Sequence, residues 1–300
     1  MKNFLYKVTL FSIPVFAFLI LAGFFAGGYT DPFYVRFTTP KQQNLILGSS
    51  RSAQGLRPEI INKILEKKFF NYSFTIAHSP YGPVYLESIK KKHNKRKGGI
   101  FILEVNPWTI SSRIQDPEDY TRFRENNLCL ANMYFVNINP NYEYLFKNMQ
   151  GNYNRIFVPP YKNHFLHEDG WLEVNVPMDS LSIEKRIEKK LKDYKENILP
   201  VSKISQYRIK YLNKAILYFK QYGKVYLVRV PVSSGILELE NQLAPEFDQD
   251  IGQAISNADG YLDLTRTNDQ FIYTDGNHLY KDSGKKVSTI IANWIKKEKN

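Results

Sequence analysis

Two short stretches near opposite ends of the chain carry residue types that together could perform acyl-ester chemistry. The first is GSSR (residues 48–51), which follows an apolar run, and the second is DGNH (residues 275–278). A serine hydroxyl becomes a nucleophile when a histidine takes its proton and an acid orients that histidine. We therefore predict that Ser50 is the nucleophile, His278 the base and Asp275 the orienting acid.

Four further residues belong to the predicted site or its surroundings. Ser49 can accept hydrogen bonds from the first N–H groups of a helix, so we expect it to belong to the turn. The backbone N–H of Ser50 and the side-chain amide of Asn106, in LEVNPW, are the predicted oxyanion donors. Arg51 and His78 are candidates for substrate contacts, although Arg51 could instead pair with a carboxylate of the fold and His78 could be structural.

The elements that must position these residues alternate between strand and helix. Strands are predicted at 44–48, 69–74, 99–105, 224–230 and 260–264, and helices at 58–67, 84–93 and from about 280 onward. The alternation predicts an α/β fold with a doubly wound, mostly parallel five-stranded sheet and right-handed crossovers. Active sites of such sheets gather at the carboxyl ends of the strands, which is where Ser50 and Asn106 fall.

The segment between the third and fourth predicted strands is too long for one crossover. Residues 107–204 hold an aromatic- and Asn-rich region followed by a charged helix at 182–198. We expect this segment to be an insertion over one end of the sheet, where loops often define the substrate. The body, residues 31–300, is expected to form one domain.

The first thirty residues determine the expected location. Residues 8–30 carry no charge. Lys2 and Lys7 come before this run, and Asp31 follows it. About 20 apolar helical residues span the hydrocarbon core of a bilayer, and cytoplasmic flanks are enriched in lysine. We expect a retained single-pass anchor (residues 1–30) in the inner cell membrane, with the body outside the cytoplasm. The alternative is a cleaved signal peptide.

Charge and cysteine content exclude several classes of function. The formal net charge is +12, from 41 Lys and Arg against 29 Asp and Glu, which favours an anionic glycan or lipid head group as partner. No basic motif interleaved with aromatics is present, so nucleic acid is not expected. The single cysteine, Cys129, excludes an internal disulfide and a Cys-based zinc site. HFLHED (164–169) reads as a polar loop, and we expect no metal or cofactor.

The ordered motifs resemble those of the SGNH (GDSL-like) hydrolase superfamily. Gly48-Ser49-Ser50 is similar to the Gly-Asp-Ser block, with Ser49 replacing the usual Asp and Ser50 at the nucleophile position. DGNH, followed by Gly284, is similar to the final Asp-x-x-His block. Asn106 falls where the third-block Asn is expected, although Val-Asn-Pro departs from the common form. The stretch 71–80 lacks the second-block Gly, which leaves one oxyanion donor unassigned.

The Ser-Ser-Arg form and the anchor are most similar to a membrane-anchored subset that acts on cell-envelope polymers, as in alginate O-acetylation and teichoic acid D-alanylation. The resemblance implies a flavodoxin-like fold, an acyl-serine intermediate and, as a partner, a multi-span membrane-bound O-acyltransferase. We expect transfer of an acyl group, such as acetyl, to an envelope glycan in the periplasm or outside the cell. The alternatives are a carbohydrate esterase or lipase and a non-catalytic binding or assembly subunit.

Overall fold

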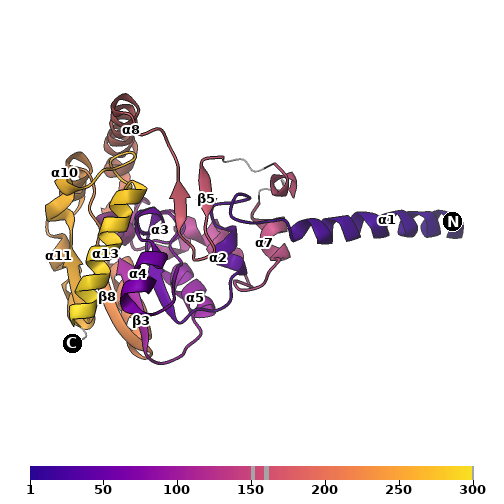
Figure 1. Ribbon diagram of the computed structural model, residues 1–300, viewed down its shortest axis with the longest axis horizontal. Helices are drawn as coiled ribbons and strands as arrows, with labels where there is room; N and C mark the ends of the chain where they lie inside the picture. The colour runs from indigo at the N-terminus through magenta and orange to yellow at the C-terminus, as the bar shows by residue number, and fades with distance from the viewer. Residues whose placement is uncertain (150–152, 159–161, 299–300) are drawn as a thin grey trace.

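A parallel sheet of five strands lies at the centre of the body (Figure 1). The computed structural model describes residues 1–149, 153–158 and 162–298. The strands are hydrogen bonded in the order β2 (Phe69–Asn71), β1 (Asn44–Leu47), β3 (Gly99–Glu104), β8 (Gly223–Arg229) and β9 (Gly260–Asp263), all parallel. This is the flavodoxin-like order, in which ligands bind where the strand order reverses. The predicted doubly wound α/β sheet is confirmed.

Helices cover both faces of this sheet. α4 (Pro58–Leu65) and α13 (Lys281–Glu298) pack on one face, and α5 (Pro83–Lys92), α9 (Gln206–Lys220) and α12 (Gly252–Asn257) pack on the other. Alternate residues of β3 enter the two cores, with Phe101 and Leu103 on the α5–α9 side and Ile100 and Ile102 on the α4–α13 side. Coverage on both faces explains why the strand is apolar throughout.

The second strand is shorter than predicted. It was expected over 69–74, but the ladder ends at Asn71. The chain stays extended beyond that point, since Tyr72 N donates to Ile46 O at 2.8 Å and Phe74 N to Gly48 O at 3.3 Å. It then turns at Thr75, whose carbonyl accepts from two following N–H groups. The turn brings residues 75–79 onto the same edge of the sheet as the end of β1.

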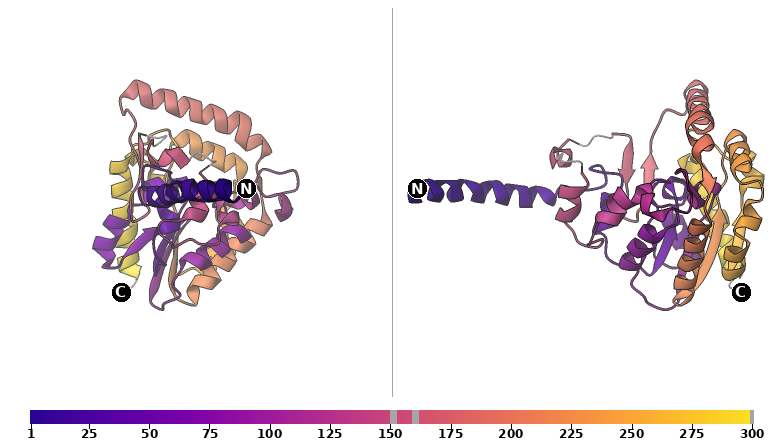
Figure 2. Two further views of the ribbon diagram at one scale, coloured as in Figure 1. Left: turned by 90° about the vertical axis from the view of Figure 1, so that its right-hand side faces the viewer. Right: turned by 180° about the vertical axis from the view of Figure 1, so that it is seen from behind.

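The predicted insertion lies between β3 and α9. Its elements are η1 (Pro107–Ile110), β4 (Ser111–Ser112), η2 (Tyr120–Arg122), η3 (Arg124–Asn127), α6 (Cys129–Asn132), α7 (Tyr142–Lys147), η4 (Tyr153–Ile156), β5 (His164–Leu166), β6 (Leu172–Val174), α8 (Ser180–Asp193), η5 (Tyr194–Ile198), η6 (Leu199–Val201) and β7 (Lys203–Ile204). The strands pair antiparallel as β4–β7 and β5–β6. The predicted charged helix is α8, continued by the π-helical turn η5. This helix crosses one end of the body, and the left panel of Figure 2 shows it from the side along the top.

Five further elements lie before, between and after the strands of the sheet. They are α2 (Tyr34–Thr38), α3 (Ser50–Gly55), α10 (Ser234–Leu243), α11 (Phe247–Asp250) and η7 (Thr265–Gln270).

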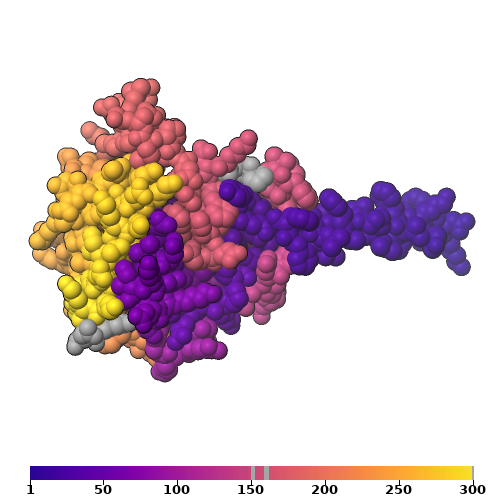
Figure 3. Space-filling model, viewed as in Figure 1, coloured from indigo at the N-terminus to yellow at the C-terminus, as the bar shows by residue number. Residues whose placement is uncertain are grey.

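The N-terminal helix α1 (Lys2–Gly23) stands clear of the body (Figures 1 and 3). Its most apolar 18-residue window has a mean hydropathy of 2.1 and none of that window is buried. Contact with the body begins in its last turns, where the ring of Phe18 lies 6.1 Å from that of Phe157 and the carbonyls of Leu19 and Ile20 accept hydrogen bonds from Tyr153 and Tyr142. Ala22 and Gly23, at its end, are buried. Among the described residues, it is the one helix long and apolar enough to cross a membrane, a property that a signal sequence shares.

Candidate active site

The turn after β1 leaves Ser50 partly accessible and buries Ser49. Gly48 has φ +145, and a Cβ there would lie 2.6 Å from Glu104 Oε2, so the position requires glycine. Ser49 is the N-cap of α3, and its hydroxyl accepts from Arg51 N at 3.3 Å. Ser50 is the first helical residue, so its backbone N–H has no acceptor within the helix. As predicted, Ser49 belongs to the turn.

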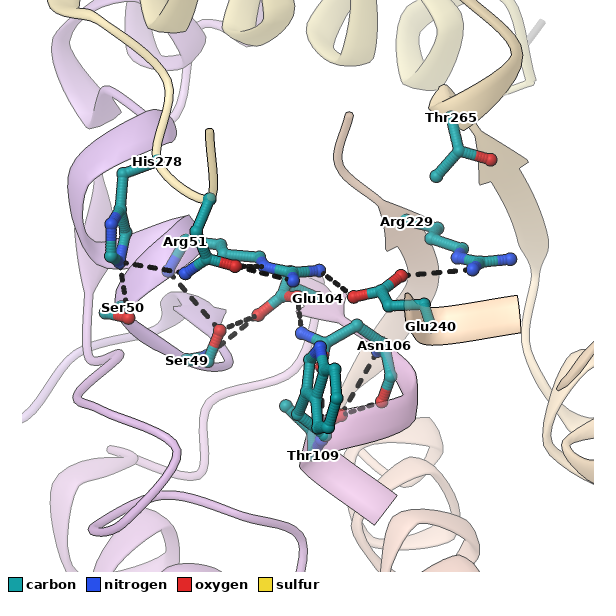
Figure 4. A network of polar contacts seen from close by, with 12 residues as sticks. Ser49, Ser50, Arg51, Glu104, Asn106, Thr109, Arg229, Glu240, Thr265 and His278 are labelled. Atoms are coloured by element: carbon teal, nitrogen blue, oxygen red, sulfur yellow. Dashed lines mark hydrogen bonds and ion pairs between the residues drawn. The ribbon is translucent and has the colours of Figure 1, made fainter. Parts of the chain in front are cut away.

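The structure brings Ser50, His278 and Asp275 into one hydrogen-bonded chain. Ser50 Oγ lies 2.8 Å from His278 Nε2 (Figure 4), and His278 Nδ1 lies 3.0 Å from both carboxylate oxygens of Asp275. With the proton on Nδ1, the imidazole donates to the carboxylate and its Nε2 lone pair accepts from the serine hydroxyl. This is the geometry by which a histidine removes a serine proton.

The loop that holds Asp275 is fixed by its own backbone and by the insertion. Asp275 Oδ1 accepts from Asn277 N at 3.1 Å and from His278 N at 3.0 Å, which closes a tight turn. Gly276 within that turn has φ +80. From α8, Arg186 Nε donates to Thr274 O at 2.7 Å.

Lys190, also on α8, forms an ion pair with Asp275 Oδ2 at 3.1 Å. Burial by itself would raise the pKa of Asp275, but the neighbouring His278 and Lys190 outweigh it and hold that pKa well below its usual value. The carboxylate therefore stays ionised at neutral pH, as an acid that stabilises an imidazolium must.

A buried glutamate at the end of β3 anchors the serine turn. Glu104 is fully buried, and its Oε2 accepts from Ser49 N at 2.8 Å and from Ser49 Oγ at 2.9 Å. Ser52 Oγ lies 3.4 Å from the same oxygen. These bonds tie the turn after β1 to the neighbouring strand, so they fix the backbone that carries Ser50.

Asn106 is placed differently from the prediction. Its side chain is fully buried, with Nδ2 donating to Glu104 Oε1 and Oδ1 accepting from Thr109 N at 3.1 Å, which caps η1. It does not line the cavity beside Ser50. The structure therefore corrects the expected oxyanion contact to a structural role, because the buried carboxylate of Glu104 needs the amide donor.

Arg51 lies inside the protein and takes the structural alternative considered above. It is 3% exposed, its Nη1 pairs with Glu240 at 2.5 Å, and its Nη2 and Nε donate to Asn277 Oδ1 at 2.7 and 3.0 Å. Glu240 also pairs with Arg229 at 3.1 Å (Figure 4). Since Asn277 Nδ2 lies 3.3 Å from His278 Nε2, this network positions the loop that carries the base.

His78 lies on the loop after β2 and supports it from within. Its Nδ1 is 2.7 Å from Thr75 Oγ1, and its ring contacts that of Phe33 with centroids 4.7 Å apart. Burial, together with the charge of Arg124, lowers the pKa of His78 to about 4. The ring is neutral at pH 7 and supplies no positive charge to an anionic substrate.

Ser50 opens into a cavity of about 260 Å³. Thr75 and His164 are among the residues that line it. Of the two histidines in HFLHED, His164 therefore faces the cavity, whereas His167 Nε2 lies 2.9 Å from Glu173 on the paired strand. Within the described ranges, no three His, Cys, Asp or Glu side chains cluster as a metal site would require.

Sequence reasoning missed four residues of this site: Glu104, Lys190, Glu240 and Asn277. Glu104 carried a signal, since it is an acid within the apolar run 99–105, and buried acids require partners. Glu240 lies beside Asn241 and Gln242 in a polar stretch, and nothing in the sequence marks it as buried. Asn277 lies inside a quoted motif but was given no role. Lys190 is one of many lysines on α8, and nothing in the sequence distinguishes it from its neighbours.

No family model matches this sequence, and no curated protein matches it significantly. Two solved structures of an aryl esterase from M. smegmatis align with 85% of this chain and with 99% of their own. The inhibitor-bound form has 10% sequence identity and a TM-score of 0.39, and the native form has 11% and 0.38. Similarity this low gives no information about the activity of this chain.

Proposed function

We propose that this chain is an acyl-ester enzyme that uses Ser50 as its nucleophile. The observation that carries the proposal is the continuous chain from Ser50 Oγ through His278 to Asp275, with distances of 2.8 and 3.0 Å. Activation of a serine needs a base within hydrogen-bond reach and an acid that orients the base, and both conditions are met. The opening of Ser50 into a cavity adds room for a substrate.

In the proposed reaction, Ser50 Oγ attacks the carbonyl carbon of an ester while its proton passes to His278 Nε2. The tetrahedral intermediate collapses, the ester C–O bond breaks and His278 returns the proton to the departing oxygen. An alcohol or water then attacks the acyl-Ser50 in the reverse sense, again with His278 as base. Asp275 remains ionised and stabilises the imidazolium at both stages.

Two backbone N–H groups are proposed as oxyanion donors. Ser50 N is free of helical bonding by its position, and Thr75 N comes from the loop that replaces the Gly-containing second block. Thr75 lines the cavity beside Ser50, whereas Phe74 N donates to Gly48 O and Ala77 N donates to Thr75 Oγ1 at 3.3 Å. Preorganised donors of this kind typically contribute about 10²–10³-fold in rate each.

The finer proposal is acyl transfer to a cell-envelope glycan by a chain anchored outside the cytoplasm. The apolar helix α1 and the lysines that precede or border its apolar run support the anchor and its orientation. Pro32 and Phe33, which follow that helix closely, form part of the cavity wall at Ser50. An acyl donor delivered at the membrane, by a multi-span O-acyltransferase partner, would enter there.

A second cavity supports an anionic acceptor. It has a volume of about 220 Å³ and lies between Ile76 and Ala77, next to the loop residue Thr75, and Trp108 after β3. Arg113, Arg124, Arg208 and Glu125 line it, and Arg208 and Glu125 pair with each other at 2.7 Å. The guanidinium groups of Arg113 and Arg124, outside that pair, favour a carboxylate- or phosphate-bearing sugar, in keeping with the net charge of +12.

Labelling with a fluorophosphonate, which reacts with activated serines, tests the enzyme proposal. The full chain in detergent is expected to be labelled, Ser49→Ala to retain label and Ser50→Ala to lose it. A folded wild-type chain without label would contradict the proposal and leave the non-catalytic binding subunit.

Transfer and hydrolysis are separated by the fate of the acyl group. Ser50 is acylated with an activated acetyl ester and chased with an acidic envelope oligosaccharide, and both products are followed by mass spectrometry. Transfer predicts acetylated sugar that increases with sugar concentration. Free acetate alone, at every sugar concentration, would identify a hydrolase instead.

A further inference from the structure

The cavity beside Ser50 is lined largely by apolar side chains that the proton-transfer chain does not use. Its walls include Pro32, Phe33, Ala53, Phe74 and Leu172. Pockets for drug-sized ligands usually measure about 300–1,000 Å³, so a volume of about 260 Å³ suits a smaller group. The apolar walls suit a hydrocarbon chain better than a sugar.

Phe33 lines the cavity and comes from the segment between α1 and α2. Its ring lies against that of Phe74, with centroids 5.4 Å apart, and against His78 at 4.7 Å. Ala53, on α3, lines the same cavity three residues after the nucleophile. The wall is therefore shared between the catalytic helix and the segment that follows the apolar helix.

Asp31 fixes the backbone of that segment. Its Oδ1 accepts from Phe33 N and from Tyr144 Oη, both at 2.7 Å. The carboxylate is buried, and this burial raises its pKa although both hydrogen bonds act in the opposite direction. The segment is thus held against α7, and Phe33 cannot swing away without breaking a buried contact.

Arg36 fixes the same wall from its other side. The guanidinium is fully buried, and its donors reach three carbonyl oxygens at 2.7–3.2 Å, those of Pro32, Asn71 and Gly170. One side chain therefore ties the segment after α1 to the end of β2 and to the β5–β6 hairpin. Because its partners are backbone carbonyls, it holds the walls at fixed separations.

We propose that this cavity binds the acyl chain of the ester and that Phe33 sets the longest chain that it admits. The inference rests on the proposed function and specifies its acyl group. The ester carbonyl carbon bonds to Ser50 Oγ, its bond to the leaving oxygen breaks, and the proton passes through His278 to that oxygen. The chain lies in the cavity throughout.

Hydrolysis of p-nitrophenyl esters of two to sixteen carbons tests the inference, using the full chain in detergent. Wild type is expected to show a kcat/KM that falls at least 10-fold once the acyl chain exceeds the length that the cavity holds, since one methylene in an apolar pocket discriminates by about 10-fold or more. Phe33→Ala is expected to move that fall to longer chains and to raise the rate just beyond the wild-type limit at least 10-fold relative to the two-carbon rate. Ala53→Val is expected to move the fall to shorter chains.

Tyr29→Ala is the matched control, because Tyr29 lies in the same segment and its ring contacts Phe165 and not the residues of this wall. A flat chain-length profile in wild type, or the same profile in Phe33→Ala and Tyr29→Ala, would overturn the inference. If Phe33→Ala fails to fold, Phe33→Leu and Ala53→Val decide it. Absence of both turnover and fluorophosphonate labelling at Ser50 would instead overturn the proposed function.

Discussion

Ser50 Oγ and His278 Nε2 lie 2.8 Å apart although 228 residues separate them in the chain. The contact depends on the close approach of α3, which begins at Ser50, and α13, which begins three residues after His278. Gly55 and Gly284 meet at that crossing, where a Cβ on Gly284 would lie 2.9 Å from Gly55 O. The nucleophile and its base are therefore paired by helix packing between the two ends of the body.

Gly284→Ala is expected to lower both stability and activity, because the added methyl group pushes α13 away from α3. Overpacking of this kind costs about 1–3 kcal/mol. Thermal unfolding and ester turnover measure the two effects. The control is Gly252→Ala, whose Cβ would meet nothing within 4 Å. An equal effect in both variants would show that the crossing does not set the geometry.

Asp275→Asn is expected to reduce kcat about 10³–10⁴-fold with little change in KM. The neutral amide can no longer stabilise the imidazolium. If its NH2 group faces His278 Nδ1, it also favours the tautomer whose Nε2 carries the proton and cannot accept one from Ser50. Steady-state kinetics on a short-chain ester check this, with Asp282→Asn, in the first turn of α13, as the control. A loss below 10-fold would argue against a role for Asp275 in catalysis.

Ser49→Ala is expected to cost about 1–2 kcal/mol of unfolding free energy, because it removes the N-cap of α3 and a hydrogen bond to buried Glu104. Fluorophosphonate labelling at Ser50 should persist. Urea unfolding measures the cost. Loss of labelling in a well-folded Ser49→Ala chain would contradict the assignment of Ser50 as the nucleophile and point to Ser49.

Arg51→Met is expected to destabilise the protein by about 3–5 kcal/mol, because Glu240 loses one of its two buried cations. The double variant Arg51→Met with Glu240→Gln, which removes the unbalanced charge but keeps an acceptor for Arg229, should recover part of that loss. Lys147→Met, which breaks an exposed ion pair with Glu143, should cost no more than about 1 kcal/mol. No recovery in the double variant would show that the pairing is not the source of the cost.

His78 is expected to make the protein less stable as the pH falls from about 6.5 to 4. The unfolded chain binds this proton near pH 6.5, whereas the folded chain binds it only near 4, because burial and Arg124 lower the pKa. Within that window the unfolded state holds more protons, so acid favours unfolding. The loss between pH 7 and 4.5 should be about 2 kcal/mol smaller in His78→Asn. Equal pH slopes in unfolding experiments would contradict this reasoning.

The sequence by itself determined the sheet and the identities of the residues that now form the chain of hydrogen bonds. Continuous apolar runs such as 99–105 indicate strands covered on both faces, and the alternation with helices leaves few topologies. Because parallel strands end at one edge, the position of Ser50 after β1 was also readable. The length and composition of α1 were equally local properties.

Only the tertiary structure decided which polar groups face the cavity and which form hydrogen bonds or ion pairs in the protein interior. Arg51 follows the end of β1 as an open donor would, yet Glu240 on α10 binds it. Glu104, at the end of β3, likewise binds Ser49 in the turn after β1. Phe33 reaches the cavity because the segment after α1 folds back over β2. Such pairings join distant parts of the chain, and local sequence patterns carry no information about which distant partner satisfies a buried charge.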